Sequence, residues 1–100
     1  MPDIFTIEMF ADHVNSKFLM HYGDSQTAEL ELIRVKDVGS SERQKQFSLQ
    51  FLGPLDAPIL QGIYKVDHDA LGRLDLFLVP IARDDKGVQY EAIFNRVIEP

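Results

Sequence analysis

The three histidines are the first residues to consider for chemistry, because an imidazole titrates near neutral pH and is a common metal ligand. They are His13, His21 and His68. Their spacing matches no metal-binding motif. His68 is the one that we carry forward as a candidate general base, in the alternative that the chain is an enzyme of unrecognised type.

His68 lies between two carboxylates, Asp67 and Asp69. Such a triplet resembles a small metal-binding site. In a strand, however, the middle residue points away from its two neighbours, so the three side chains cannot converge on one ion unless the strand ends there. We therefore expect a polar strand end, in which Asp69 caps the backbone amides of Ala70 and Leu71 in the following turn.

Carboxylates elsewhere suggest two further kinds of site. Asp84 and Asp85 lie in an oxygen-rich turn of the type that binds calcium, but Lys86 places a cation among them and calcium needs six or more oxygens. A hairpin turn accounts for these residues. Glu29 and Glu31 would share one outward face, about 7 Å apart by strand geometry, and we expect a solvated edge rather than a glycosidase cleft.

Aromatic side chains give the candidate ligand-facing residues, which are Tyr64, Tyr90 and Phe94. Their alternation in two apolar runs places them on the inner faces of strands. In a chain of this size, such residues form the core. The alternative is a narrow ligand cavity in a partly open barrel.

One apolar run has hydrophobic residues at both parities. From Leu76 to Ile81 the chain is almost continuously apolar, which indicates a strand covered on both sides or one whose outer face meets another molecule. We take Phe77, Val79 and Ile81 as candidate interface residues. The alternative is that these side chains are core residues beneath a helix.

Composition limits the classes of partner. The 100-residue chain has a formal charge of −6 and contains no cysteine, so disulfides, thiolate catalysis and Cys-based metal sites are excluded. The acidic balance disfavours nucleic acid, because phosphate contacts supply most of that affinity. No apolar run approaches the roughly 20 residues that span a bilayer, and no export signal is visible. We expect one cytoplasmic domain over residues 1–100, with no membrane association, or alternatively export within a larger particle.

Most of the chain alternates as strands do. The second half has four β-rich runs and the first half has two, the second of which reverses the parity of its apolar residues between Leu32 and Ile33. A reversal of parity indicates a β-bulge. The runs are Lys17–Tyr22, Ala28–Lys36, Phe47–Leu52, Leu60–His68, Arg73–Arg83 and Val88–Arg96.

The N-terminal segment has helical periodicity instead. Ile7, Phe10, Ala11, Val14 and Phe18 recur at spacings of three and four, which predicts a short helix that ends near residues 15–16 and caps one end of the β core. The fold class is therefore α+β and mainly β. We expect a short N-terminal helix on a curved antiparallel sheet of about six strands, which closes wholly or partly into a small β-barrel.

Four sequence blocks together form a pattern. They are Phe-Ser-Leu-Gln-Phe-Leu-Gly-Pro at 47–54, Gln-Gly-Ile-Tyr at 61–64, Leu-Phe-Leu-Val-Pro-Ile at 76–81 and Tyr-Glu-Ala-Ile-Phe-Asn at 90–95. On these blocks the chain resembles a family of small bacterial proteins containing a domain of unknown function, over essentially its whole length. The resemblance implies a compact β fold and a loose association with phage-tail-like collar or fibre proteins. It supplies no active-site residues.

We therefore expect a non-enzymatic protein–protein interaction or structural module without a cofactor or a metal. Its partner would be another protein or a second copy of the chain. The first alternative is a barrel that binds a small molecule through Tyr64, Tyr90 and Phe94, and the second is the enzyme with His68 as its base.

Overall fold

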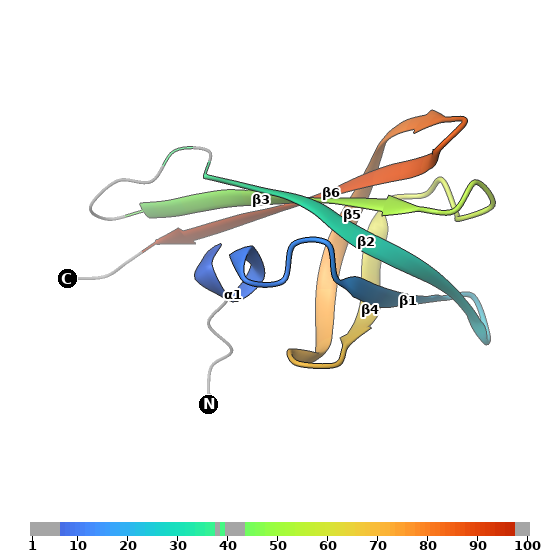
Figure 1. The fold of residues 1–100 in the computed structure, drawn as a ribbon, viewed down its shortest axis with the longest axis horizontal. Helices are drawn as coiled ribbons and strands as arrows, with labels where there is room; N and C mark the ends of the chain where they lie inside the picture. Colours follow the sequence, from blue (N-terminus) through green and yellow to red (C-terminus); the bar gives the residue numbers. More distant parts are fainter. Residues whose placement is uncertain (1–6, 38, 40–43, 98–100) are drawn as a thin grey trace.

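A computed structural model describes residues 7–37, 39 and 44–97 of the chain (Figure 1). Within these residues, one short helix precedes six strands. The elements are α1 (Ile7–Ala11), β1 (Lys17–Tyr22), β2 (Gln26–Asp37), β3 (Gln44–Gly53), β4 (Gly62–His68), β5 (Gly72–Asp84) and β6 (Gly87–Val97). The six strands predicted from alternation are confirmed, with ends that differ by a few residues.

The strands form a closed antiparallel barrel in the order β1-β2-β3-β6-β5-β4. Neighbours in sequence pair at β1–β2, β2–β3, β4–β5 and β5–β6. Two pairings join distant segments: β3 with β6 over ten residue pairs, and β1 with β4 over three, from Leu19↔Asp67 to His21↔Lys65. The predicted mainly β fold is thus confirmed, and the short β1–β4 seam completes the barrel.

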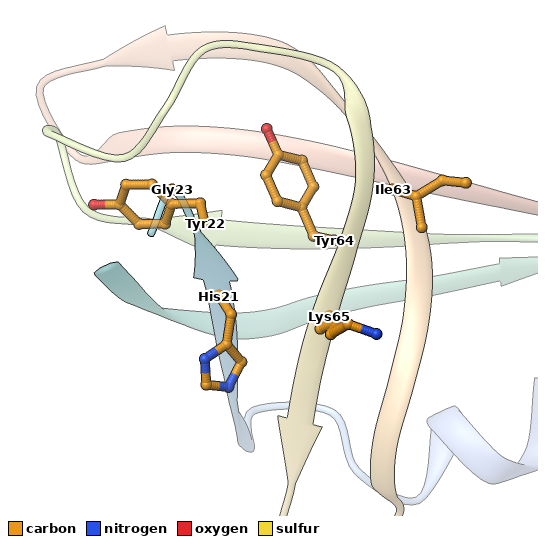
Figure 2. A pocket seen from close by; sticks show the side chains of 6 residues that line it. All are labelled: His21, Tyr22, Gly23, Ile63, Tyr64 and Lys65. Carbon is orange, nitrogen blue, oxygen red and sulfur yellow. The ribbon is translucent and has the colours of Figure 1, made fainter. Parts of the chain in front are cut away.

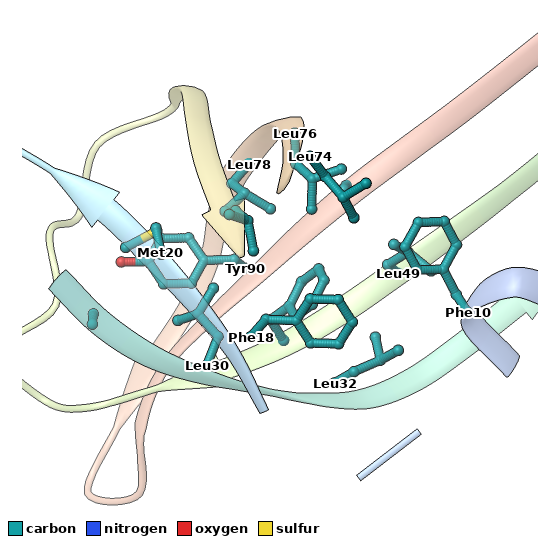
Figure 3. Packing of buried hydrophobic residues seen from close by; sticks show 14 of the residues in the cluster. Phe10, Phe18, Met20, Leu30, Leu32, Leu49, Leu74, Leu76, Leu78 and Tyr90 are labelled. Carbon is teal, nitrogen blue, oxygen red and sulfur yellow. The ribbon is translucent and has the colours of Figure 1, made fainter. Parts of the chain in front are cut away.

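The interior is filled by alternate residues from all six strands (Figure 3). Phe18 of β1 meets Phe51 of β3 edge to face, with ring centroids 5.2 Å apart. This is the expected core of a small barrel, in which every second side chain points inward. The largest fully buried side chains are Tyr90, Phe10, Phe18, Phe51, Met20, Leu30, Leu32, Leu49, Leu76, Leu78, Val66 and Val88.

Two irregularities bend the strands. The register between β2 and β3 shifts between Leu32 and Arg34, which confirms the bulge predicted from the reversal of parity. A second shift lies on β5 between Pro80 and Ala82, and the sequence analysis did not predict it. Proline cannot donate to a ladder, so a bulge is one of the few places where a strand accommodates it.

The predicted helix is too long. α1 ends at Ala11, and Phe18 lies in β1 rather than on a helical stripe. Asn15, two residues before β1, has a φ of 73°, and its N–H donates to the carbonyl of Leu32 at 2.7 Å. The β1–β2 ladder and burial inside the barrel determine the position of Phe18, whatever its helical spacing.

Helix α1 lies against the part of β3 and β6 that runs on past the other strands (Figure 1). Phe10 packs there on Phe47 and Phe94, with ring centroids 6.1 Å and 5.7 Å away. Phe47 and Phe94 also stack on each other at 4.9 Å. The helix therefore covers that end of the core, as predicted.

Candidate functional site

The outward side chains of β4 and β5 form three successive cross-strand pairs, which we call the β4–β5 wall. The pairs are Ile63↔Phe77, Lys65↔Asp75 and Asp67↔Arg73. The first is apolar and solvent-exposed, since Ile63 is 74% and Phe77 52% exposed. The other two are ionic, with Lys65 Nζ 3.7 Å from Asp75 Oδ1 and Arg73 Nε 2.7 Å from Asp67 Oδ1.

The three candidate interface residues all lie on β5. Phe77 faces outward on the wall and Val79, two residues later on the same face, is half-buried. Ile81 is exposed at the bulge beside Pro80. None of the three belongs to the buried core, so the alternative that they are core residues beneath the helix does not fit the structure.

Two exposed residues of this region were missed by the sequence analysis. Ile63 faces outward on β4, and Leu60, just before that strand, is 68% exposed. A signal for Ile63 was present, because it shares the parity of Lys65 and Asp67 and so is an apolar residue on a polar face. Leu60 lies outside the strand, where alternation carries no information.

Asp67 links three strands of the barrel. Its carboxylate accepts hydrogen bonds from Arg73 on β5, at 2.7 and 3.0 Å, and Oδ2 lies 2.6 Å from His21 Nε2 on β1. The Arg73 and His21 hydrogen bonds hold the pKa of Asp67 far below its usual range, and the same contact raises the pKa of Arg73. A carboxylate held in this way remains ionised and is a poor general base.

His68 is buried at the end of β4, and hydrogen bonds fix its tautomer. Its Nδ1 accepts the backbone N–H groups of Ala70 at 3.0 Å and Leu71 at 3.1 Å. Nδ1 is therefore unprotonated and Nε2 carries the hydrogen, which it donates to Ser16 Oγ at 2.9 Å. Ser16 in turn donates to the carbonyl of His13 at 2.5 Å.

The prediction that Asp69 caps the turn amides is thus wrong, because the imidazole of His68 accepts both of them. Desolvation lowers the pKa of His68, the nearby His13 lowers it further, and Asp69 opposes the shift. Both ring nitrogens are already used to join the β4–β5 turn to the chain before β1. This is the arrangement of a structural histidine.

A surface hollow of about 340 Å³ opens where β1 and β4 separate (Figure 2). Residues 21–23 and 63–65 line it. Figure 2 shows Tyr64 on the side of β4 toward His21, with Ile63 and Lys65 projecting to the other side. Its volume is at the lower end of the range for ligand sites.

The three candidate ligand-facing residues are not grouped around this hollow. Tyr64 lines it and donates its hydroxyl to the carbonyl of Leu60. Tyr90 is fully buried and donates to the carbonyl of Pro58, and burial raises its pKa to about 12. Phe94 stacks on Phe47 at the helix-covered end.

Three of the remaining carboxylate candidates, Glu29, Glu31 and Asp84, have local partners. Lys17 Nζ lies 3.5 Å from Glu31 and 4.0 Å from Glu29, on the outer faces of β1 and β2. Asp84 Oδ1 accepts the N–H of Lys86 at 2.9 Å within the β5–β6 turn. Within residues 7–37, 39 and 44–97, no group of three His, Cys, Asp or Glu side chains is placed to hold a metal ion.

Comparison with known protein families identifies a matching family. The family model described as "Domain of unknown function (DUF6916)" matches residues 5–94. No curated protein and no solved structure matches the chain. Over the part of the chain that the structure describes, no helix is long and apolar enough to cross a membrane.

Proposed function

The chain belongs to the family of domains of unknown function DUF6916, and from this premise we propose that it is a non-enzymatic protein–protein interaction or structural module. It binds its partner through the β4–β5 wall. The observation that carries the proposal is the solvent-exposed Ile63–Phe77 pair on the outer face of β4 and β5. A filled barrel of this size gains nothing for its own stability from placing these side chains in water.

The free energy available from burying this pair is substantial. Phe77 leaves about half of the roughly 150–250 Å² of an aromatic side chain exposed, so about 100 Å² would be buried by a partner, which corresponds to about 2.5 kcal/mol at 25 cal/mol per Å². Ile63, which is more exposed, would add a similar amount. Aromatic anchors of this kind dominate protein interfaces.

The titratable groups support the non-enzymatic reading. His68 uses both ring nitrogens to hold backbone and Ser16, and Asp67 is occupied by Arg73 and His21. Each would have to break structural hydrogen bonds before it could transfer a proton to or from a substrate. The more specific role, as an accessory of a phage-tail-like assembly, rests on the sequence resemblance.

Affinity capture tests this function. The tagged protein is used with two variants, Phe77→Glu on the wall and Ile93→Glu on β6, where Ile93 is 66% exposed and lies beyond the last residue that pairs with β5. We expect a stoichiometric partner that is retained by the Ile93 variant and lost by the Phe77 variant. The same binding should be reproduced with purified proteins. A partner held equally by both variants would argue against the wall.

A second candidate function is the binding of a small molecule in the hollow lined by Tyr22 and Tyr64. Two tyrosine rings beside an open strand edge offer stacking surfaces for a planar ligand. NMR titration with a fragment library tests this alternative. Shifts confined to residues 21–23 and 63–65, and abolished in Tyr64→Ala, would support it over the wall.

A further inference from the structure

We infer that the occupant of the β4–β5 wall is a second copy of the same chain, so that the protein is a homodimer in which two β4–β5 walls pack face to face. This inference rests on the proposed function, because it identifies the partner of the same surface. Two observations carry it: the apolar area of the wall and the distribution of charge over the molecule.

The apolar area suits a small symmetric interface. Five apolar side chains lie on and beside the wall: the exposed Leu60, Ile63, Phe77 and Ile81 and the half-buried Val79. Together they present roughly 400 Å² of apolar surface, judged from the usual area of such side chains. One side of a standard interface buries about 800 Å², of which about 65% is apolar in homodimers. The wall therefore supplies most of the apolar content that such an interface needs.

The charge distribution permits self-association at this wall. The chain carries a formal charge of −6. The six charged residues of β4 and β5 nevertheless balance, with three cations, Lys65, Arg73 and Arg83, and three anions, Asp67, Asp75 and Asp84. The net charge thus lies outside these two strands, so two copies that meet at the wall bring together strand pairs that each have a net charge of zero.

The ion pairs also set the edge of the interface. Burying a salt bridge costs desolvation energy, so Lys65–Asp75 and Asp67–Arg73 belong at the solvated rim and Ile63 with Phe77 at the centre. Two regular sheets that pack face to face align their strands within about 30° of each other. A two-fold axis near the Ile63–Phe77 pair places the same residues on both sides, as an isologous dimer requires.

The test is the oligomeric state of the purified protein. Sedimentation equilibrium over a range of concentrations is expected to show a monomer–dimer equilibrium. Phe77→Glu and Ile63→Glu should each weaken it at least about thirtyfold, whereas Ile93→Glu should leave it unchanged. Circular dichroism spectra like that of the unmodified protein, and similar urea midpoints at concentrations at which all of the proteins are monomeric, would show that the variants remain folded.

The other outcomes separate this inference from the proposed function. A monomer at all concentrations that still captures another protein through Phe77 would overturn the homodimer and leave the interaction function standing. A monomer that captures nothing would overturn both. A dimer unaffected by both wall variants, or weakened equally by Ile93→Glu, would place the interface elsewhere and overturn the inference.

Discussion

The hydrogen bonds of His68 lead to a quantitative prediction for the variant His68→Ala. The substitution leaves the amides of Ala70 and Leu71 without their acceptor. Ala70 is exposed and Leu71 is half-buried, so water can replace part of the lost bonding and each amide should cost about 1 kcal/mol. Loss of the ring contact with Phe18, whose centroid is 4.4 Å away, and of the hydrogen bond to Ser16 together adds about 1.5 kcal/mol. We expect a total destabilisation of about 3.5 kcal/mol.

The matched control is His68→Asn. The oxygen of an asparagine side chain can accept backbone amides two or three residues further along the chain, as in an Asx turn. This variant should therefore recover the turn and lose only the ring packing and the contact with Ser16, about half of the effect. Urea unfolding followed by circular dichroism at pH 7.5 measures both free energies. A His68→Ala variant within 0.5 kcal/mol of the unmodified protein, or two equally damaged variants, would refute the reasoning.

The pH dependence gives an independent check on the same residue. Burial and the nearby His13 lower the pKa of His68 in the folded protein below the usual 6.5, against the opposing effect of Asp69. Between those two pKa values the unfolded chain binds a proton that the folded protein does not. The contribution of His68 to the free energy of unfolding is therefore fully present above about pH 6.5. It falls as the pH decreases toward the folded pKa, by at most about 1.4 kcal/mol per pH unit.

Asp67 affects the stability of the protein over a separate, lower range of pH. Its pKa is lowered by Arg73 and His21, so its contribution is present above the usual value of 3.8 and is lost at lower pH. The difference between the unmodified protein and His68→Asn, measured from pH 7.5 to 5, therefore isolates His68. A difference that does not change with pH over that range would contradict the assigned neutral tautomer.

Two further predictions concern Tyr90 and Gly87, which are both buried. Tyr90→Phe should lower the free energy of unfolding by about 1 kcal/mol at pH 7, because it removes the hydrogen bond to Pro58. Since burial raises the pKa of Tyr90 to about 12, the unmodified protein should lose stability as the pH rises above about 10. An equally steep alkaline loss in the variant would exclude Tyr90 as its source. Gly87→Ala should cost about 3 kcal/mol or more, because Gly87 has a φ of 141° and an added Cβ would lie 2.0 Å from the carbonyl oxygen of Gly53. In the control Gly62→Ala, the added Cβ would meet no atom within 4 Å, so its free energy of unfolding should stay within about 0.5 kcal/mol of that of the unmodified protein. Equal melting temperatures for the two glycine variants would show that the close approach of Gly87 to Gly53 does not affect stability.

The sequence determined the features that one segment can express alone. Alternation of apolar and polar residues located all six strands, and the reversal of parity after Leu32 located the bulge between Leu32 and Arg34. Both follow from the two-residue period of a β-strand, which is a property of neighbouring residues. The predicted end of the helix was wrong because the apolar spacing continued to Phe18. The five residues of α1 are too few for periodicity to locate its end.

The tertiary structure decided what depends on distant segments. Closure requires β1 to meet β4 and β3 to meet β6, and alternation within a strand does not say which strand will lie beside it. The pairing of β4 with β5 places Ile63 beside Phe77, and closure of the barrel leaves this pair on the outside. The meeting of β1 with β4 brings His68 within reach of Ser16, 52 residues away in the chain. Local patterns assign a side chain to one face of its strand, but only the closed barrel determines which face lies in water and which residues share it.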